Sequence, residues 1–402
     1  MKKLPKYLKT VIILLVLIVI TGLPAISPRL CDWYTDHIYG VLCDAVSHIT
    51  GVFPFALGEI IMYLGIVLLV AGIVFLLLLI FLRKKPRYRK FVKVYFQSFS
   101  IALLIVVLIY MPAWFVPFCG TVLGQGNPEL RTTFTYEEIS DLLRYVVESG
   151  NAAAEEITIA EDGSVAFRSN EENRALVIKA MQDLGSEFPR LKGYYPPVKP
   201  AICSDILDRM GIGGYNYPYT MEPTHNRYMS PLWMPVLDAH EYSHHKGYYK
   251  ENEGNLLSVL ALSRSEDPYI RMAAFIEMYD YLYMAYIEAQ DQVLDQMIAS
   301  GEITDWPEQI QTKEDIEQRK QIYVRVFGGE PEFTDRVWQI YNAGMEIEKE
   351  IYEADSHPID DMPSVNEVIT ETADTGWKVQ GDILQENSYD GVTLLLLQYF
   401  YK

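Results

Sequence analysis

Cysteine is scarce in this chain, and its spacing excludes two kinds of small, cross-linked domain. The 402 residues include four cysteines, too few for a disulfide-dense scaffold and without a Cys-x-x-Cys pair of the kind that binds a metal ion. Internal repeats and long low-complexity linkers are also missing. The chain is long enough for a membrane region followed by one domain of good size.

Acidic residues are rare in the first third of the chain, and basic residues are outnumbered in the rest. Residues 1–122 contain 12 Lys and Arg against 4 Asp and Glu, a balance of +8. Residues 123–402 contain 22 against 49, a balance of −27, so the net charge is −19. A domain this acidic repels phosphate backbones, which excludes nucleic acid as a partner.

Long apolar runs dominate the first third. They are residues 10–26, 57–82 and 98–118. Each is long enough to cross a bilayer, and Glu59 is the one charge within the second. Pro112 in the third is tolerable because neighbouring helices can satisfy the carbonyl that it frees. We therefore expect a multi-pass cell-membrane protein, with the lipid bilayer as a partner, a membrane region at 1–122 and one further domain at 123–402.

Basic residues indicate the orientation of these runs. They gather before the first run (Lys2, Lys3, Lys6, Lys9) and between the second and third (Arg83, Lys84, Lys85, Arg87, Arg89, Lys90, Lys93). By the positive-inside rule, the N-terminus and the 83–97 loop are cytoplasmic, and three crossings place the C-terminal domain outside the cytoplasm. The first run could instead be a cleaved signal peptide, which leaves this orientation unchanged.

The segment 27–56 is rich in aromatic residues, which suits a position at the membrane interface or packing against the spans. Those aromatics are Trp33, Tyr34, Tyr39 and Phe53. Cys31 and Cys43 share the oxidising side under this topology, where a disulfide between them is chemically allowed.

Helical spacing prevails after residue 122. It covers residues 170–186, 203–210, 254–264, 267–299, 313–327, 332–353 and 389–401. Thr135 and Glu138 have the spacing of a capping box, and Asp162-Gly163 is a turn signal within a short β-like piece. We expect a mainly α fold, with three transmembrane helices and a mostly helical α+β domain, and we expect the tyrosine-rich stretch 278–286 to be core.

Residues 240–244 read His-Glu-Tyr-Ser-His. On a helix, His240 and His244 lie on one face and can present two imidazole nitrogens to one ion. Glu241 projects beside that ion, where it can accept a proton from an activated water and return it to the leaving group. The pattern predicts one Zn²⁺ ion, although a solvated helix face with two unconnected histidines is the simpler alternative.

A third ligand has to come from a segment that turns back. Gly247 can end the helix in a left-handed turn, and a new apolar helix begins near residue 250. Glu251 shares a face with Asn255, so we expect Glu251 to bind the metal and Asn255 to hydrogen-bond a ligand histidine. Glu253 is the alternative ligand. His245 points away from His244 and is expected to be a neighbour only.

The spacing resembles a known peptidase pattern. His-Glu-x-x-His followed by Glu-x-x-Gly-Asn is similar to the gluzincins, in which a glutamate on a following helix is the third ligand. The metzincin pattern needs a histidine at position 250, where this chain has Lys250, a poor ligand because it stays protonated.

Residues 215–261 and the C-terminal stretch GWKVQGDILQENSYDGVTLLLLQYF also resemble a bacterial membrane family of unknown function. That family has three N-terminal spans and an acidic run ending Glu-Ala-Asn, where this chain has Gly254 in place of alanine. The resemblance implies a zincin-like extracytoplasmic domain.

Zincins bind extended peptides along a sheet-edge strand ahead of the motif helix. In this chain the segment beginning at Thr224, with His225, Asn226, Arg227 and Tyr228, is the candidate for such strand addition. An ordinary tyrosine-rich surface loop is the alternative.

These patterns predict a membrane-anchored zinc-dependent metallohydrolase that acts outside the cytoplasm, with a peptidase as the expected activity and a peptide or protein as substrate. A non-peptide amide, such as a cell-wall crosslink, is a weaker option for the substrate. The alternative from another class is a metal-stabilised membrane scaffold or sensor that cleaves nothing.

Overall fold

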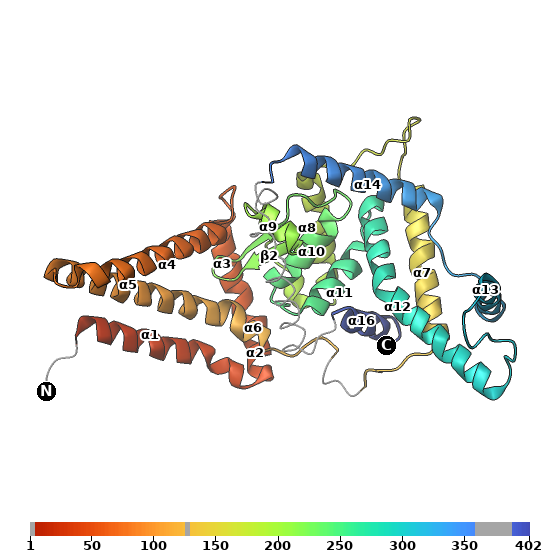
Figure 1. Cartoon of the computed structure of the whole chain (residues 1–402), viewed down its shortest axis with the longest axis horizontal. Coiled ribbons are helices and arrows are strands. Elements are labelled where there is room, and N and C mark those ends of the chain that lie inside the picture. Colours follow the sequence, from red (N-terminus) through yellow and green to blue (C-terminus); the bar gives the residue numbers. More distant parts are fainter. Residues whose placement is uncertain (1–4, 125–128, 358–387) are drawn as a thin grey trace.

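A computed structural model describes residues 5–124, 129–357 and 388–402 of the chain. It is 69% helical with 3% strand, which confirms the expected mainly α fold. Three long apolar helices project to one side of a helical domain (Figure 1). They run over Lys6–Ile26, Leu57–Leu82 and Pro86–Phe118, and by length and composition each could cross a membrane.

The first of these spans comprises α1 (Lys6–Gly22) and a 3-10 turn, η1 (Leu23–Ile26). The second is α4 (Leu57–Leu82), and the third joins α5 (Pro86–Tyr110), a π-helical turn η3 (Met111–Phe115) and α6 (Val116–Phe118). Large apolar side chains such as Phe81 and Val19 remain 81% and 64% exposed. Such surface is stable in lipid and unstable in water.

The expected cytoplasmic loop at 83–97 is wrong in its extent. The helix α5 begins at Pro86, so the connection between the second and third spans is Arg83–Lys85. Proline fits the first turn of a helix because its missing N–H has no partner there. Four of the seven cations of this region therefore lie on α5 itself.

Segment 27–56 is mostly one helix, made of α2 (Pro28–Tyr34), a π-helical η2 (Thr35–Tyr39) and α3 (Gly40–Thr50). Tyr34 and Tyr39 are buried, as packing against the spans requires, whereas Trp33 is exposed. All four cysteines are free. Cys31 and Cys43 lie twelve residues apart on this helix, about 18 Å along its axis, too far for the disulfide considered above.

A small mixed sheet lies between the spans and the helical domain. Its strands are β1 (Lys199–Pro200), β2 (Gly214–Tyr217) and β3 (Glu222–His225), in the order β1-β3-β2. β3 pairs in parallel with β1 and antiparallel with β2. It is therefore the central strand, and β2 is an edge.

The second span is bonded directly to this sheet region. The buried Glu59 carboxylate in the first turn of α4 accepts the backbone N–H groups of Ile202 (2.8 Å) and Cys203 (2.7 Å). Glu222 of β3 accepts the N–H of Gly58 at 2.9 Å. The single charge in the second apolar run is thus a polar anchor at the end of the span.

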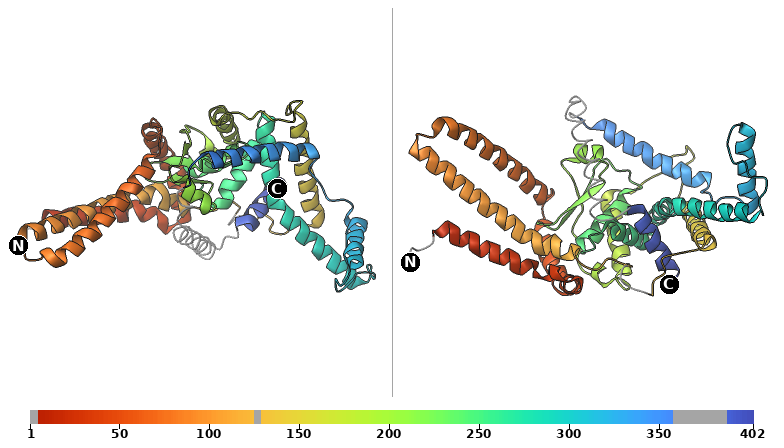
Figure 2. Two further views of the ribbon diagram at one scale, coloured as in Figure 1. Left: turned by 45° about the horizontal axis from the view of Figure 1, so that its top comes forward. Right: turned by 60° about the horizontal axis from the view of Figure 1, so that its bottom comes forward.

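The helical domain packs around one apolar core. Its helices are α7 (Tyr136–Glu155), α8 (Asn170–Leu184), α9 (Ser204–Arg209), α10 (Met234–His245), α11 (Glu251–Leu262), α12 (Pro268–Ser300), α13 (Lys313–Phe327), α14 (Asp335–Ala354) and α16 (Ser388–Phe400). α12 lies beside α7, and α14 crosses one end of the domain (Figures 1 and 2). The predicted helical stretches are confirmed.

The predicted capping box, turn and core tyrosines are also confirmed. Thr135 and Glu138 form the expected capping box, and Asp162-Gly163 turns the chain between the bridged residues Ile159 and Val165. Tyr281 and Tyr286 of the tyrosine-rich stretch are buried in the core, as expected. The first half of the C-terminal stretch singled out above lies outside the described residues.

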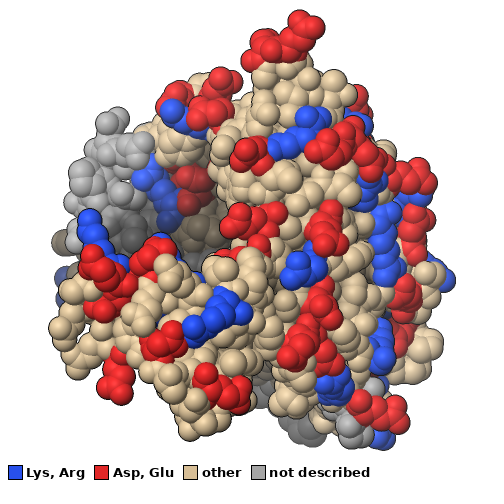
Figure 3. All heavy atoms as spheres, turned by 90° about the vertical axis from the view of Figure 1, so that its right-hand side faces the viewer, with Lys and Arg blue, Asp and Glu red and all other residues tan. Residues whose placement is uncertain are grey.

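The face that looks away from the three apolar helices is strongly charged. Asp and Glu side chains are interleaved there with Lys and Arg (Figure 3). This surface is suited to water, in contrast to the apolar faces of the spans.

Candidate metal centre

The helix that carries His-Glu-Tyr-Ser-His, α10, is largely buried between the sheet and α11. Proline at its first turn favours initiation, and it ends at His245. Gly247 follows with φ +88°, the left-handed conformation expected for a chain reversal. A Cβ atom at Gly247 would lie 2.8 Å from Thr35, so the turn also packs tightly against η2.

The reversal brings three predicted ligands together. His240, His244 and Glu251 each offer one ligand atom, and these atoms lie within 4.8 Å of one another. Glu251 Oε2 is 3.2 Å from His240 Nε2 and 3.7 Å from His244 Nε2. The two rings are nearly perpendicular, with centroids 4.6 Å apart. Two imidazole nitrogens and one carboxylate oxygen are a donor set that zinc accepts, with room for a further ligand.

The ring of His244 is held by the backbone. Its Nδ1 lies 2.7 Å from the carbonyl of Tyr248, so Nδ1 carries a proton, and Nε2 is the nitrogen that faces Glu251. Asn255 was expected to supply such a bond. Among the described contacts its side chain makes none with either histidine, and for His244 the Tyr248 carbonyl supplies the bond instead.

His240 lies against α11 at Gly254. A Cβ atom built at Gly254 would come within 2.9 Å of His240 Cε1 and 3.0 Å of its Nδ1. The absence of a side chain at this position therefore lets the ring approach the helix that carries Glu251.

Glu253, the alternative ligand, is engaged elsewhere. Its buried carboxylate accepts the N–H groups of Leu123 (2.8 Å) and Lys250 (3.4 Å), which caps the start of α11. His245 is fully buried and lies against Cys43, away from the other two histidines. Both side chains serve the junction between the domain and the membrane helices.

Glu241 lies beside this cluster. Its side chain is 3% exposed, and its Oε2 has no hydrogen-bond partner among the described residues. A Cβ atom at Gly214 would lie 2.6 Å from Glu241 Oε1, so the edge strand β2 runs directly against the carboxylate. Burial raises the pKa of Glu241 to about 7, and the two histidines only partly oppose this.

The candidate ligands shift the pKa values of one another. Burial disfavours the charged ring of His244, but the Glu251 carboxylate outweighs this effect and raises the pKa of His244 to about 9. Burial likewise opposes the charge of Glu251, yet the histidines hold the pKa of Glu251 well below its ordinary value. The site thus stabilises an anionic ligand next to two imidazoles, an arrangement suited to a cation.

The segment beginning at Thr224 is predicted to be an edge strand that binds substrate, but it does not lie at an edge of the sheet. Thr224 and His225 lie in β3, which is paired on both sides and cannot accept another strand. His225 Nδ1 instead forms a buried bond of 2.8 Å with Asp238 on α10. Asn226 is buried as well, and its amide donates to Asp208 (3.1 Å).

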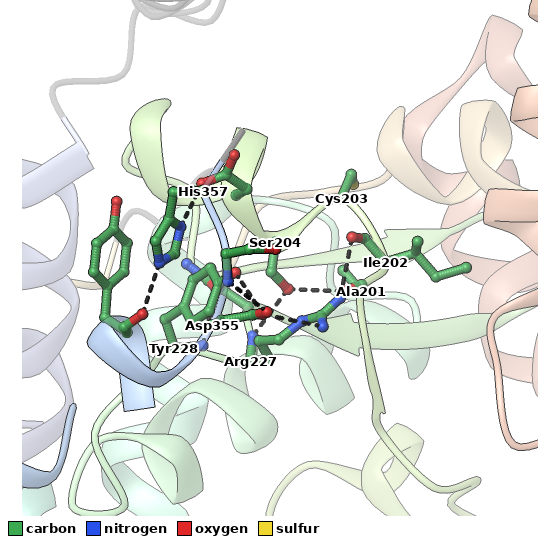
Figure 4. Close-up of polar contacts among 12 residues, drawn as sticks. Ala201, Ile202, Cys203, Ser204, Arg227, Tyr228, Asp355 and His357 are labelled. Atoms are coloured by element: carbon green, nitrogen blue, oxygen red, sulfur yellow. Dashed lines mark hydrogen bonds and ion pairs between the residues drawn. The ribbon is translucent and has the colours of Figure 1, made fainter. Parts of the chain in front are cut away.

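Arg227 and Tyr228 anchor the end of α14 (Figure 4). Arg227 donates to the carbonyls of Ala201 and Ile202 and lies 3.5 Å from Asp355. The Tyr228 hydroxyl donates to the same Asp355 carboxylate at 2.9 Å. These contacts give both side chains a structural role away from the ligand cluster.

Sequence reasoning missed the tyrosine that links the site to the spans. The Tyr249 ring is parallel to that of His244, with centroids 6.1 Å apart. Its hydroxyl donates to the Ala113 carbonyl in η3 at 2.8 Å and lies 2.8 Å from the Tyr39 hydroxyl. No local pattern singles out Tyr249 from the many tyrosines around it, because its partners are more than a hundred residues away.

Comparison with known proteins gives one match. A family model described as a protein of unknown function, DUF3810, matches residues 34–341, about three quarters of the chain. The matched region begins after the first apolar helix and contains all three candidate ligands. No curated protein and no solved structure matches.

Proposed function

This chain belongs to the DUF3810 family of proteins of unknown function, and we propose that it is a membrane-anchored zinc-dependent hydrolase, most simply a peptidase. The observation that carries the proposal is the convergence of His240, His244 and Glu251, with ligand atoms within 4.8 Å of one another. The buried carboxylate of Glu241 beside them makes hydrolysis the function that this arrangement favours over simple metal storage.

Each residue has a distinct task in this proposal. A bound zinc ion would activate water and polarise the scissile carbonyl. Glu241 takes the proton from the attacking water and delivers it to the leaving amine. Its apolar surroundings favour this exchange because they bring its pKa close to neutral. The Tyr248 carbonyl holds a proton on His244 Nδ1, so Nε2 is the nitrogen that would bind the zinc ion.

The edge strand β2 supports a peptide as substrate. Within the described residues, β2 pairs with β3 alone, so its outer side offers backbone donors and acceptors. Gly214 places this edge against Glu241, and Tyr215 is 48% exposed beside it. An extended peptide that added to β2 would present its backbone to the catalytic carboxylate.

Charge and shape together support an extracytoplasmic domain. The start of α1 and the turn between α4 and α5 lie at the same end of the spans, remote from the domain (Figure 1). This end carries Arg83, Lys84 and Lys85. By the positive-inside rule, this charge supports a cytoplasmic position for that end and an extracytoplasmic position for the domain.

Metal analysis of purified protein tests the ligand assignment. We expect about one zinc per chain in the wild type and a loss of zinc in His240→Ala. His37→Ala is the matched control, since His37 is an exposed histidine bonded to the Trp33 carbonyl. Wild-type protein with no more zinc than His240→Ala contradicts the proposal.

A metal-stabilised scaffold or sensor is the second candidate, and the bond from Tyr249 to Ala113 of the third span favours it. Glu241→Gln separates the two functions, because it keeps the three ligands and removes the base. For a hydrolase, this variant retains zinc and loses about 10²–10⁴-fold in peptide cleavage. If the protein is a scaffold, Glu241→Gln corrects every defect of a strain that lacks the protein.

A further inference from the structure

An apolar pocket lies where the spans meet the domain. Its volume is about 320 Å³, roughly ten times the share of one water molecule. Its lining residues include Leu17, Val46, Leu108, Ala113, Tyr219 and Met221. They come from α1, α3, the third span and the connection between β2 and β3. The hydroxyl of Thr21, also in the wall, donates to carbonyls of its own helix.

The pocket belongs to the membrane part of the molecule. Leu17 and Thr21 are near the domain end of α1, and Leu108 is near the domain end of α5. Neighbouring side chains on α1, Val16 and Ile20, are 52% and 53% exposed and face the space that lipid fills. An apolar pocket between transmembrane helices at this level is accessible to hydrocarbon chains, whereas a polar ligand would lose its hydration there.

The pocket is also joined to the metal centre. The carbonyl of Ala113, a wall residue, accepts the Tyr249 hydroxyl, and the Tyr249 ring lies over His244. Met221 lies 3.8 Å from the Tyr39 hydroxyl, which is bonded to the same tyrosine. One side chain therefore separates the apolar pocket from a metal ligand.

The connection between β2 and β3 gives the second link. Tyr219 and Met221 line the pocket, and the strand that leads into them, β2, runs along Glu241 at Gly214. The chain therefore connects the wall of the pocket at Tyr219 to the Glu241 carboxylate at Gly214 through β2.

We propose that the substrate is a peptide tethered to the membrane by an acyl chain, which occupies this pocket while the peptide lies along β2. The inference rests on the proposed hydrolase function. Water adds its oxygen to the scissile carbonyl carbon, the C–N bond breaks, and the proton passes through Glu241 to the amine. The acyl chain takes no part in the chemistry and holds the peptide at the membrane surface.

Photo-crosslinking tests the pocket directly. The probe is a palmitoylated peptide with a diazirine in the acyl chain, added to full-length Glu241→Gln protein in lipid nanodiscs. We expect the cross-links to map to residues of α1, α3 and the third span that line the pocket. Leu108→Trp and Val46→Trp fill the pocket and should reduce the yield roughly tenfold. Leu103→Trp, on a 54% exposed face of α5, should not.

Cleavage assays with wild-type catalytic residues complete the test. We expect the acylated peptide to be preferred over the same peptide without acyl chain, and Leu108→Trp to lose this preference while it still cleaves the bare peptide. Equal cleavage of both peptides by the unmodified protein, with cross-links outside the pocket, overturns the inference and leaves the hydrolase intact. Cross-links in the pocket without any cleavage overturn the proposed function and leave acyl binding intact.

An ordinary membrane lipid is the remaining occupant to exclude. A diazirine phosphatidylcholine at the same density serves as competitor probe. If it labels the pocket as strongly as the acylated peptide and is not displaced by it, the pocket is a site for bulk lipid and the inference is wrong.

Discussion

The hydroxyl of Tyr249 donates a hydrogen bond of 2.8 Å to the carbonyl of Ala113, and this bond joins the metal-ligand segment to the third membrane helix. The acceptor lies in a π-helical turn that contains Pro112. Pro117, four residues after Ala113, has no N–H to donate to this carbonyl, and π-helical turns often accompany functional sites. The tyrosine thus satisfies a carbonyl that the span itself does not.

Tyr249→Phe should therefore destabilise the protein. It keeps the ring beside His244 but leaves the Ala113 carbonyl buried without its donor, at a cost of about 1–3 kcal/mol. Thermal unfolding in detergent measures the change. Tyr283→Phe is the control, because the Tyr283 hydroxyl makes only a long, exposed bond of 3.4 Å to Glu330. An unchanged unfolding temperature for Tyr249→Phe contradicts this role.

Substitutions at Gly254 should act through His240. Gly254→Val places two methyl groups where the imidazole ring lies and should weaken zinc binding by about 10–100-fold. Gly254→Ala, which introduces the alanine usual in the family that this chain resembles, adds a single Cβ 2.9 Å from His240 Cε1, so it displaces the ring less than valine does and should retain more zinc. Competition with a chelator gives both affinities. Equal affinities would show that the contact with His240 does not matter.

Gly214→Ala should lower catalysis without removing metal. The added Cβ would lie 2.6 Å from Glu241 Oε1 and 2.7 Å from the Thr224 carbonyl, so the carboxylate is displaced. We expect cleavage to fall by about 10²-fold with zinc content unchanged. Gly40→Ala, a helical position with nothing within 4 Å of the added atom, is the control. Loss of zinc together with activity would point to misfolding instead.

The stability of the protein should depend on pH through Glu277. Burial raises the pKa of Glu277 above its ordinary value of 4.5, and the Tyr281 hydroxyl, at 2.5 Å, only partly opposes this. The folded state therefore holds its proton more tightly than the unfolded chain, so this group stabilises the fold at low pH and ceases to do so as pH rises past its folded pKa. Glu277→Gln should raise the unfolding temperature at pH 8 and leave it unchanged at pH 4. A uniform shift at both pH values contradicts the assignment.

Cysteine labelling should establish the orientation. In a background without native cysteines, Glu161→Cys in the domain should react with an impermeant maleimide on intact cells. Lys84→Cys, in the turn between the second and third spans, should react only after the membrane is opened. The reverse pattern would place the metal centre in the cytoplasm.

The sequence predicted the helices better than it predicted which segments lie next to one another. Apolar runs identify the spans because their length alone meets the thickness of a bilayer, and the spacing of His240 and His244 fixes their common face on a helix. The turn at Gly247 brought Glu251 to them because the connection is short. These features depend on local geometry, which a sequence encodes directly.

Order within a sheet is different, since it depends on contacts between distant segments. The segment from Thr224 to Tyr228 is predicted to be a sheet edge, yet β1 and β2 pair with both sides of the strand that contains Thr224 and His225. A two-residue strand such as β1 has no alternation by which a sequence could reveal it. For the same reason Arg227 and Tyr228 looked like substrate contacts, although their partner Asp355 lies more than a hundred residues away.

The attachment of the sheet to α4 through Glu59 has a consequence for the chemistry. The sheet that contains the strand beside Glu241 is bonded to the second span through Ile202 and Glu222, whereas the turn before Glu251 is bonded to the third. A change in the tilt between these two apolar helices would therefore move Glu241, the proposed base, relative to Glu251, the proposed ligand. Under the proposed hydrolase function, turnover should therefore depend on bilayer thickness and should differ between short-chain and long-chain lipids even when zinc occupancy does not.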